Sequence, residues 1–199
     1  MYEYIKGELA EVSPAEAIVE AAGVGYKLLI SLSTFSTLQS CVGQTVKLYA
    51  YHQVREDDES LYGFADKAER VVFTHLVSVN GVGPGSARMI LSSMTADEAT
   101  SAILGGDVGR FKAVKGIGLK TAQRIILELK DKVGKGGGEL SLEGSAAGAQ
   151  SSAVREEALS ALVLLGFSKP NVEKVLSHLL KENPSLTLEE IIKKSLKAL

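Results

Sequence analysis

The chain has 199 residues, of which 45% are hydrophobic and 23% are charged. This composition is typical of a globular protein with one large domain or two to three small ones, and it excludes the disordered and fibrous classes. The formal net charge of −2 hides an acidic block, residues 1–63 with 4 basic and 9 acidic side chains, and a basic block, residues 64–133 with 10 and 7. A basic block beside an acidic one is compatible with a nucleic-acid-binding face.

The apolar stretches, of which residues 158–167 are typical, are about ten residues long, roughly half of what a membrane span needs. The first residues are strand-like and acidic, so we expect no secretory signal. The single cysteine, Cys41, excludes an internal disulfide and fits a reducing compartment. We therefore expect a cytoplasmic protein with no membrane partner.

Residues 1–63 alternate between apolar and other residues with period two, for example along 24–32 and 46–50. This pattern is typical of half-buried strands. Four or five short strands in about 60 residues predict a small closed or nearly closed barrel such as an OB-fold.

From residue 65 the apolar period becomes helical, and glycines punctuate the chain at 81–85 and 116–118. Thr95 and Glu98 have the spacing of a capping box, which indicates the start of a further helix. We therefore expect about five short helices over residues 64–133, an all-α domain.

Two segments of this central block, residues 79–90 and 114–125, repeat each other. Each copy reads hydrophobic-x-Gly-hydrophobic-Gly-x-x-x-Ala between two helices. The glycines allow a tight turn that brings backbone N–H groups to the surface at a helix N-terminus, where a phosphate can bind. Val82 and Ile117 are expected to point inward and fix the turns. One copy alone could be an ordinary glycine-capped corner, but two copies favour binding to a phosphate backbone.

Residues 134–152 contain six glycines without periodicity and predict a flexible linker. Residues 153–199 then predict a three-helix bundle, with Pro170 in the first turn of its second helix and Thr187 capping the third. Its apolar residues Leu164, Leu165 and Phe167 are each interpreted first as core packing.

The acidic run 56–59 precedes the last predicted strand. It can be a solvated turn or a Mg²⁺-binding nuclease cluster, although adjacent carboxylates in one loop lack the separated acids and the His or Lys of such sites. The three histidines and Cys41 lie too far apart in sequence to suggest a metal site. The chain has no Gly-x-x-x-x-Gly-Lys-Ser/Thr motif, so we expect no ATP hydrolysis, no catalytic residue and no cofactor.

The whole chain apart from the linker resembles the RuvA family, the bacterial subunits that bind Holliday junctions during branch migration. The most specific matches are Arg55-Glu-Asp followed by Leu61-Tyr-Gly-Phe, Asn80-Gly-Val-Gly-Pro, and Gly116-Ile-Gly-x-Lys-Thr-Ala. The resemblance implies a barrel over 1–63, a tandem helix-hairpin-helix domain over 64–133, the linker 134–152 and a three-helix, UBA-like motor-binding domain over 153–199. The fold class is therefore α+β and multi-domain.

The resemblance also implies a homotetramer, or two facing tetramers, that holds an open four-way junction and recruits the ATP-driven motor RuvB, with the resolvase RuvC in the larger complex. Glu56 and Asp57 would form an acidic pin that repels phosphates at the junction centre. Leu164, Leu165 and Phe167 would contact the motor. The residues expected to bind DNA are Gly81, Val82, Gly83, Gly85, Ser86, Lys115, Gly116, Ile117, Gly118, Lys120, Thr121 and Arg124. Relatives often carry lysine at the positions of Gly85 and Leu119, so binding here is expected to be weaker or more sensitive to salt.

Overall fold

The computed structural model describes residues 2–56, 59–135, 150–183 and 186–198. The chain divides into two compact units, Met1–Lys135 and Gly136–Leu199. The predicted boundary at 63/64 falls inside the first unit and stays a prediction. Of the predicted linker, residues 134–135 belong to helix α6 (Leu119–Lys135) and residues 150–152 to helix α7 (Gln150–Leu164). The rest of the linker lies outside the described residues.

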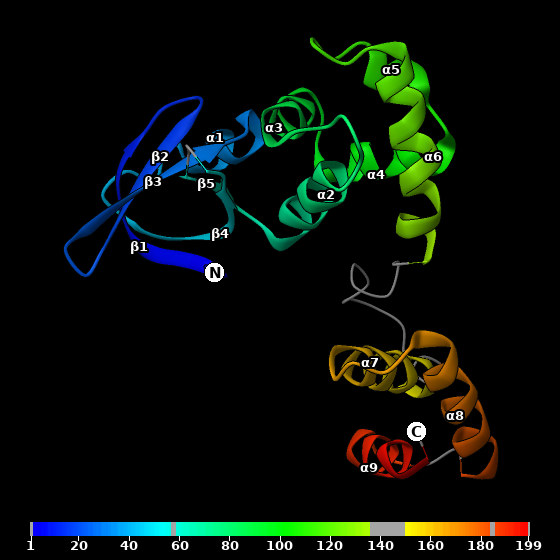
Figure 1. Cartoon of the computed structure of the whole chain (residues 1–199). Helices are drawn as coiled ribbons and strands as arrows, with labels where there is room; N and C mark the ends of the chain where they lie inside the picture. Colours follow the sequence, from blue (N-terminus) through cyan, green and yellow to red (C-terminus); the bar gives the residue numbers. More distant parts are fainter. Residues whose placement is uncertain (1, 57–58, 136–149, 184–185, 199) are drawn as a thin grey trace. The chain divides into compact units, whose positions relative to one another are not determined.

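The first unit begins with a closed five-stranded barrel of order β1-β2-β3-β5-β4 (Figure 1). The strands are β1 (Tyr4–Val12), β2 (Glu16–Ala21), β3 (Val24–Ile30), β4 (Thr45–Val54) and β5 (Glu59–Phe64). Only the β3–β5 pairing is parallel. Inward side chains such as Leu9, Val19, Leu28 and Leu48 are fully buried, as the period-two pattern predicts. The OB-like barrel is thus confirmed.

A short helix, α1 (Leu32–Leu38), connects β3 to β4, and five helices follow the barrel. They are α2 (Lys67–Val77), α3 (Pro84–Ser93), α4 (Ala96–Gly105), α5 (Val108–Lys112) and α6. The capping box at the start of α4 is present, with Thr95 and Glu98 each bonding the other's backbone N–H. The expected number of helices is confirmed.

Helices α2 and α3 lie between the barrel and the other helices of this unit (Figure 1). Phe73 of α2 packs against Tyr62 and Phe64 of β5, so the barrel and the helices share part of one core. The buried face of α2 also includes Glu69. The other buried residues of α2 are Val72, Phe73 and Leu76.

The second unit is a bundle of α7, α8 (Lys169–Glu182) and α9 (Leu188–Ala198). Among the described residues of this unit, the buried apolar core consists of Ala158, Leu162, Val172, Leu176 and Ile191. Thr187 and Glu190 bond each other's backbone N–H at the start of α9, as the sequence predicts. No helix in the described part of the chain has the length and apolar composition needed to cross a membrane.

Candidate nucleic-acid interface

The two repeated segments form hairpins with the same backbone hydrogen bonds. Gly81 and Gly116 open the two turns with φ of 90° and 88°, a conformation that favours glycine. In the first turn the N–H of Val82 donates to the carbonyl of Val79 at 3.0 Å, and in the second Ile117 donates to Val114 at 3.1 Å. The sequence repeat is therefore a repeat of geometry.

The apolar members of the hairpins point into the core. Val82 and Ile117 are buried, as are Ala87 and Ala122 one turn into the following helices. Because the Val82 and Ile117 amides donate within their turns and the side chains are buried, these two residues shape the hairpins, and a direct contact of either with DNA stays a prediction. This agrees with the expectation that they point inward.

The N-terminal turns of α3 and α6 carry backbone N–H groups without intrahelical acceptors. The first helical bond of α3 runs from Ala87 to the carbonyl of Gly83, and that of α6 from Ala122 to Gly118, each at 2.9 Å. The preceding amides, including those of Ser86 and Thr121, therefore have no acceptor in their own helix. Both ends also carry the partial positive charge of a helix N-terminus, which attracts anions.

The glycines leave the surface over these turns open. A Cβ atom built on Gly83, Gly85, Gly116 or Gly118 would have no heavy atom within 4 Å, and one on Gly81 would meet only Nη1 of Arg124, at 4.0 Å. All five glycines are exposed. A tetrahedral anion could therefore approach the backbone of both turns closely.

The predicted basic residues separate into two groups. Lys115 and Lys120 are exposed and have no ion pair among the described residues, so they are free to meet phosphates. Arg124 instead donates from Nη1 to the carbonyl of Asn80 at 3.0 Å and lies 3.8 Å from Glu128. It thereby ties α6 to the turn of the first hairpin.

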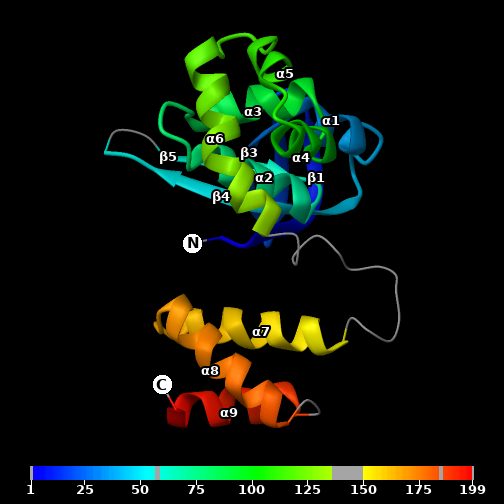
Figure 2. The same cartoon turned by 90° about the vertical axis from the view of Figure 1, so that its right-hand side faces the viewer.

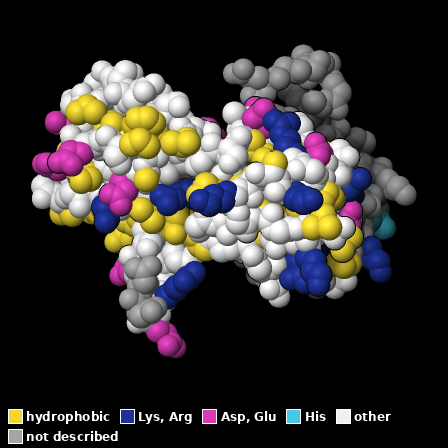
Figure 3. Space-filling view, turned by 90° about the horizontal axis from the view of Figure 1, so that it is seen from above, with side chains coloured by type: hydrophobic (Ala, Val, Ile, Leu, Met, Phe, Trp, Pro, Cys, Tyr) yellow, Lys and Arg dark blue, Asp and Glu magenta, His cyan; other side chains and the backbone are white. Residues whose placement is uncertain are grey.

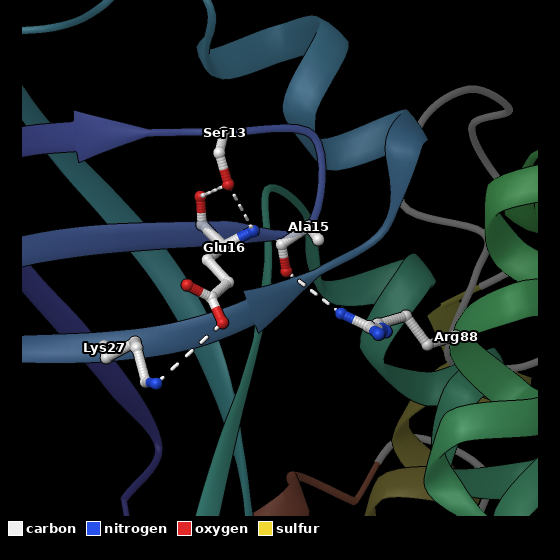
Figure 4. A network of polar contacts seen from close by, with 5 residues as sticks. All are labelled: Ser13, Ala15, Glu16, Lys27 and Arg88. Carbon is white, nitrogen blue, oxygen red and sulfur yellow. Dashed lines mark hydrogen bonds and ion pairs between the residues drawn. The ribbon is translucent and has the colours of Figure 1, made fainter.

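Arg88, a basic residue of α3, is also engaged. Its Nη1 donates to the carbonyl of Ala15 at 3.0 Å, between β1 and β2 (Figure 4). Lys132 makes a second tie between α6 and the first hairpin, from Nζ to Oγ of Ser78 at 3.2 Å. The sequence could not show these hydrogen bonds, because each joins two residues that are at least 44 positions apart in the chain.

Charge is distributed unevenly over the first unit. On the face in Figure 3, most acidic side chains lie over the barrel, whereas Lys and Arg side chains spread over the helices. This matches the acidic and basic blocks of the sequence. A polyanion would be attracted to the helices and repelled by the barrel.

Glu56 follows β4 by two residues and Glu59 begins β5, at the end where these two strands reach out past the rest of the unit (Figure 2). Glu56 is exposed, and Asp57 lies outside the described residues. Glu59 belongs to β5 and pairs with His52 of β4, with 2.6 Å between Oε1 and Nε2. Within the described residues no three His, Cys, Asp or Glu side chains form a metal-binding group.

In the second unit, the three apolar residues at the end of α7 and just after it differ in exposure. Leu164 is 88% exposed and Leu165 61%, so their interpretation as core residues is wrong. Helix α7 ends at Leu164, so the two exposed leucines are its last residue and the residue that follows it. Phe167 packs against the core, as first interpreted.

Comparison with known proteins covers almost the whole chain. Residues 1–63 match the family described as RuvA N terminal domain, 73–131 the SAM-like helix-hairpin-helix tandem, and 153–199 the RuvA C-terminal domain. A protein of Bacteroides fragilis named Holliday junction branch migration complex subunit RuvA is 47% identical over 203 residues, with 100% of both chains covered. The chain belongs to the RuvA family.

Other members of the RuvA family are similarly close. Relatives with the same printed name in Christiangramia forsetii and Cytophaga hutchinsonii are 47% and 45% identical, over 100% and 99% of both chains. The family resemblance inferred from the glycine repeat is therefore confirmed.

Proposed function

We propose that this chain is the DNA-binding subunit of a Holliday junction branch migration complex in recombination and DNA repair. The observation that carries the proposal is the pair of equivalent, open, glycine-lined turns, each at the N-terminus of a helix, in a chain of the RuvA family. Two such turns in one rigid unit can hold one duplex arm at two phosphate positions. These contacts read no base, so DNA shape decides the preference.

We further propose that four copies bind one junction, since four equivalent arms match a four-fold arrangement of subunits. Each copy would contact phosphates through the amides around Gly83, Gly85 and Gly118 and through the free cations Lys115 and Lys120. Ser86 and Thr121, both half-buried beside these turns, would add hydroxyl contacts. Binding should weaken steeply as salt rises, because each neutralised phosphate releases counterions.

The barrel would contribute repulsion at the centre of the junction. Glu56 and Asp57 would act as the acidic pin, discouraging strands from settling there and directing each into an arm. Glu56 and Asp57 would act by charge repulsion alone, so this role needs no catalytic residue and no cofactor.

The second unit would recruit the motor RuvB, and RuvC would join the larger complex. Leu164 and Leu165 present exposed apolar surface that suits a protein partner. Leu164→Ser should leave junction binding unchanged and reduce stimulation of the motor's ATPase. We place this work in the cytoplasm.

The test is a titration of a labelled four-way junction against linear duplex of equal length, at two salt concentrations, with and without Mg²⁺. Glu56→Gln/Asp57→Asn is compared with wild type. We expect strong junction preference, no cleavage, and a variant that binds at least as tightly. Cleavage with Mg²⁺ would instead indicate a structure-specific nuclease, and equal binding to duplex would indicate a generic duplex-binding module.

A further inference from the structure

A buried carboxylate joins the barrel to the first hairpin helix. Glu69 of α2 is only 3% exposed. Its Oε1 accepts from the hydroxyl of Ser31 and its Oε2 from the hydroxyl of Thr34 at 2.6 Å. The same Thr34 hydroxyl accepts from the N–H of Ala65 at 3.0 Å, where β5 leads into α2. Both carboxylate oxygens are thus fixed by hydroxyls at the start of α1, one from its N-cap residue Ser31 and one from Thr34 in its first turn.

A second contact lies one helical turn farther along α2. Phe73 follows Glu69 by four residues, so both side chains lie on one face of the helix. Its ring centroid is 5.2 Å from that of Tyr51 and 4.8 Å from that of Phe64, both on barrel strands. The apolar contact holds α2 against the barrel, and the directional bonds of Glu69 fix its rotation and tilt.

Helix α1 also bonds to α3, the second helix of the same hairpin. The N–H of Leu32 donates to Oγ of Ser92 at 3.1 Å, and Oγ of Ser33 donates to the carbonyl of Leu91 at 2.9 Å. A set of short hydroxyl contacts therefore runs along the boundary between the barrel and both helices of the first hairpin.

Burying the Glu69 carboxylate costs free energy, so these hydrogen bonds add little to the stability of the fold. A carboxylate loses its hydration when it is buried. A protein in which such a group and its partners are replaced by well-packed apolar side chains is often as stable as the original protein. Directional bonds restrict orientation far more than apolar contact does. The hydrogen bonds of Glu69 are therefore better explained by orientation than by stability.

Orientation matters because α2 leads directly into the turn with Gly81. The helix extends about 12 Å beyond Glu69, and a tilt of about 10° would move its far end by about 2 Å. Hydrogen bonds to a phosphate oxygen tolerate only a few tenths of an ångström around their optimum. Such a tilt would misalign the phosphate-binding turns with the projecting ends of β4 and β5 on the barrel.

We propose that Glu69 is a positioning residue for junction recognition, which sets the direction of the hairpins relative to the acidic end of the barrel. The inference rests on the proposed function. A linear duplex needs only the hairpins, whereas a junction must meet the hairpins and the barrel at once. Loss of Glu69 should therefore reduce preference for the junction and leave duplex binding unchanged.

The experiment compares Glu69→Met with Glu69→Gln in the full chain, and Thr95→Ala is the control. Glutamine keeps the shape and one carbonyl acceptor, whereas methionine keeps only the volume. Thr95→Ala removes the cap of α4 in the same unit without touching the barrel contact. The readouts are the ratio of duplex to junction Kd and the angle between labelled junction arms by fluorescence energy transfer.

We expect Glu69→Met to lower the ratio about tenfold, the effect of losing one charge-assisted hydrogen bond to phosphate, and to change the arm angle. Glu69→Gln and Thr95→Ala should stay within about twofold of wild type. If Glu69→Met does not fold, Ser31→Ala/Thr34→Val/Glu69→Met removes the carboxylate together with its partners and should fold and show the same loss.

If a folded variant without the carboxylate keeps the wild-type ratio of duplex Kd to junction Kd, the role of Glu69 is overturned and the proposed function is not. The same holds if Thr95→Ala lowers this ratio as much as Glu69→Met does. Wild-type protein that binds duplex as tightly as the junction would instead contradict the proposed function, and the inference with it.

Discussion

Restoring lysine at the hairpin turns should strengthen DNA binding and make it more dependent on salt. Gly85 lies in the first turn of α3, and a side chain built there meets nothing within 4 Å. Leu119 lies at the corresponding end of α6 and is 50% exposed. Both positions can therefore accept a lysine directed at solvent and at a bound phosphate.

The change in stability should be small at Gly85. Replacing glycine in a helix gains up to about 1 kcal/mol, whereas a cation at a helix N-terminus costs about 0.3–1 kcal/mol. The change in salt dependence should be large. Each new phosphate contact steepens the slope of log K against log salt by about 0.9, which is about 3.5-fold in affinity between 50 and 200 mM salt.

If four subunits engage one junction, each substitution adds four phosphate contacts. The additional loss of junction affinity between 50 and 200 mM salt is then about 150-fold. The assay is a fluorescence anisotropy titration of the junction with Gly85→Lys and Leu119→Lys at four salt concentrations. Val42→Lys, which adds the same charge at an exposed position on the barrel, is the control. A slope for Gly85→Lys equal to that of Val42→Lys would refute placement of phosphate at the hairpin turns.

Three further predictions concern stability. Gly81→Ala and Gly116→Ala should each destabilise the first unit by about 1–2 kcal/mol in urea titrations, because both residues have positive φ; no loss would contradict this turn geometry. Burial raises the pKa of Glu69 above its ordinary value of 4.5, so wild-type stability should fall as pH rises past that value, because the native state gives up the Glu69 proton less readily than the unfolded chain does. Glu69→Gln lacks this proton equilibrium and should gain stability relative to wild type over the same rise in pH; a decrease relative to wild type would contradict this. Ser195→Ala should slow amide exchange in the C-terminal bundle by stabilising it by about 0.5–1.5 kcal/mol, because the buried Ser195 hydroxyl has no partner among the described residues; faster exchange would contradict this.

Features that depend on local periodicity could be predicted from the sequence. Strand alternation predicts the barrel because inward side chains such as Leu9 and Leu28 must be apolar on every second residue. The repeated glycine pattern predicts matched turns because positive φ at Gly81 and Gly116 is a local requirement. The capping box at Thr95 is local in the same way.

Features that depend on distant partners could not be predicted. Glu69 looks like a solvent-facing residue of an amphipathic helix, and its burial follows only from Ser31 and Thr34, which are 38 and 35 residues away. Arg124 has the position and charge of a phosphate ligand, yet its guanidinium bonds the carbonyl of Asn80. Leu164, the last residue of α7, continues an apolar pattern and is nevertheless exposed, so the pattern alone could not show its exposure.

The most direct test of the two-hairpin interface is amide hydrogen exchange of the full chain with and without a saturating four-way junction. The amides in the first turns of α3 and α6 have no intrahelical acceptor and should exchange fast in the free protein. If both turns hold phosphates, exchange should slow at Gly83, Gly85 and Ser86, since Pro84 has no amide hydrogen, and to a similar extent over residues 118–121, while the β2–β3 turn at residues 22–23 stays unchanged. Slowing at only one hairpin, or at neither, would contradict the account.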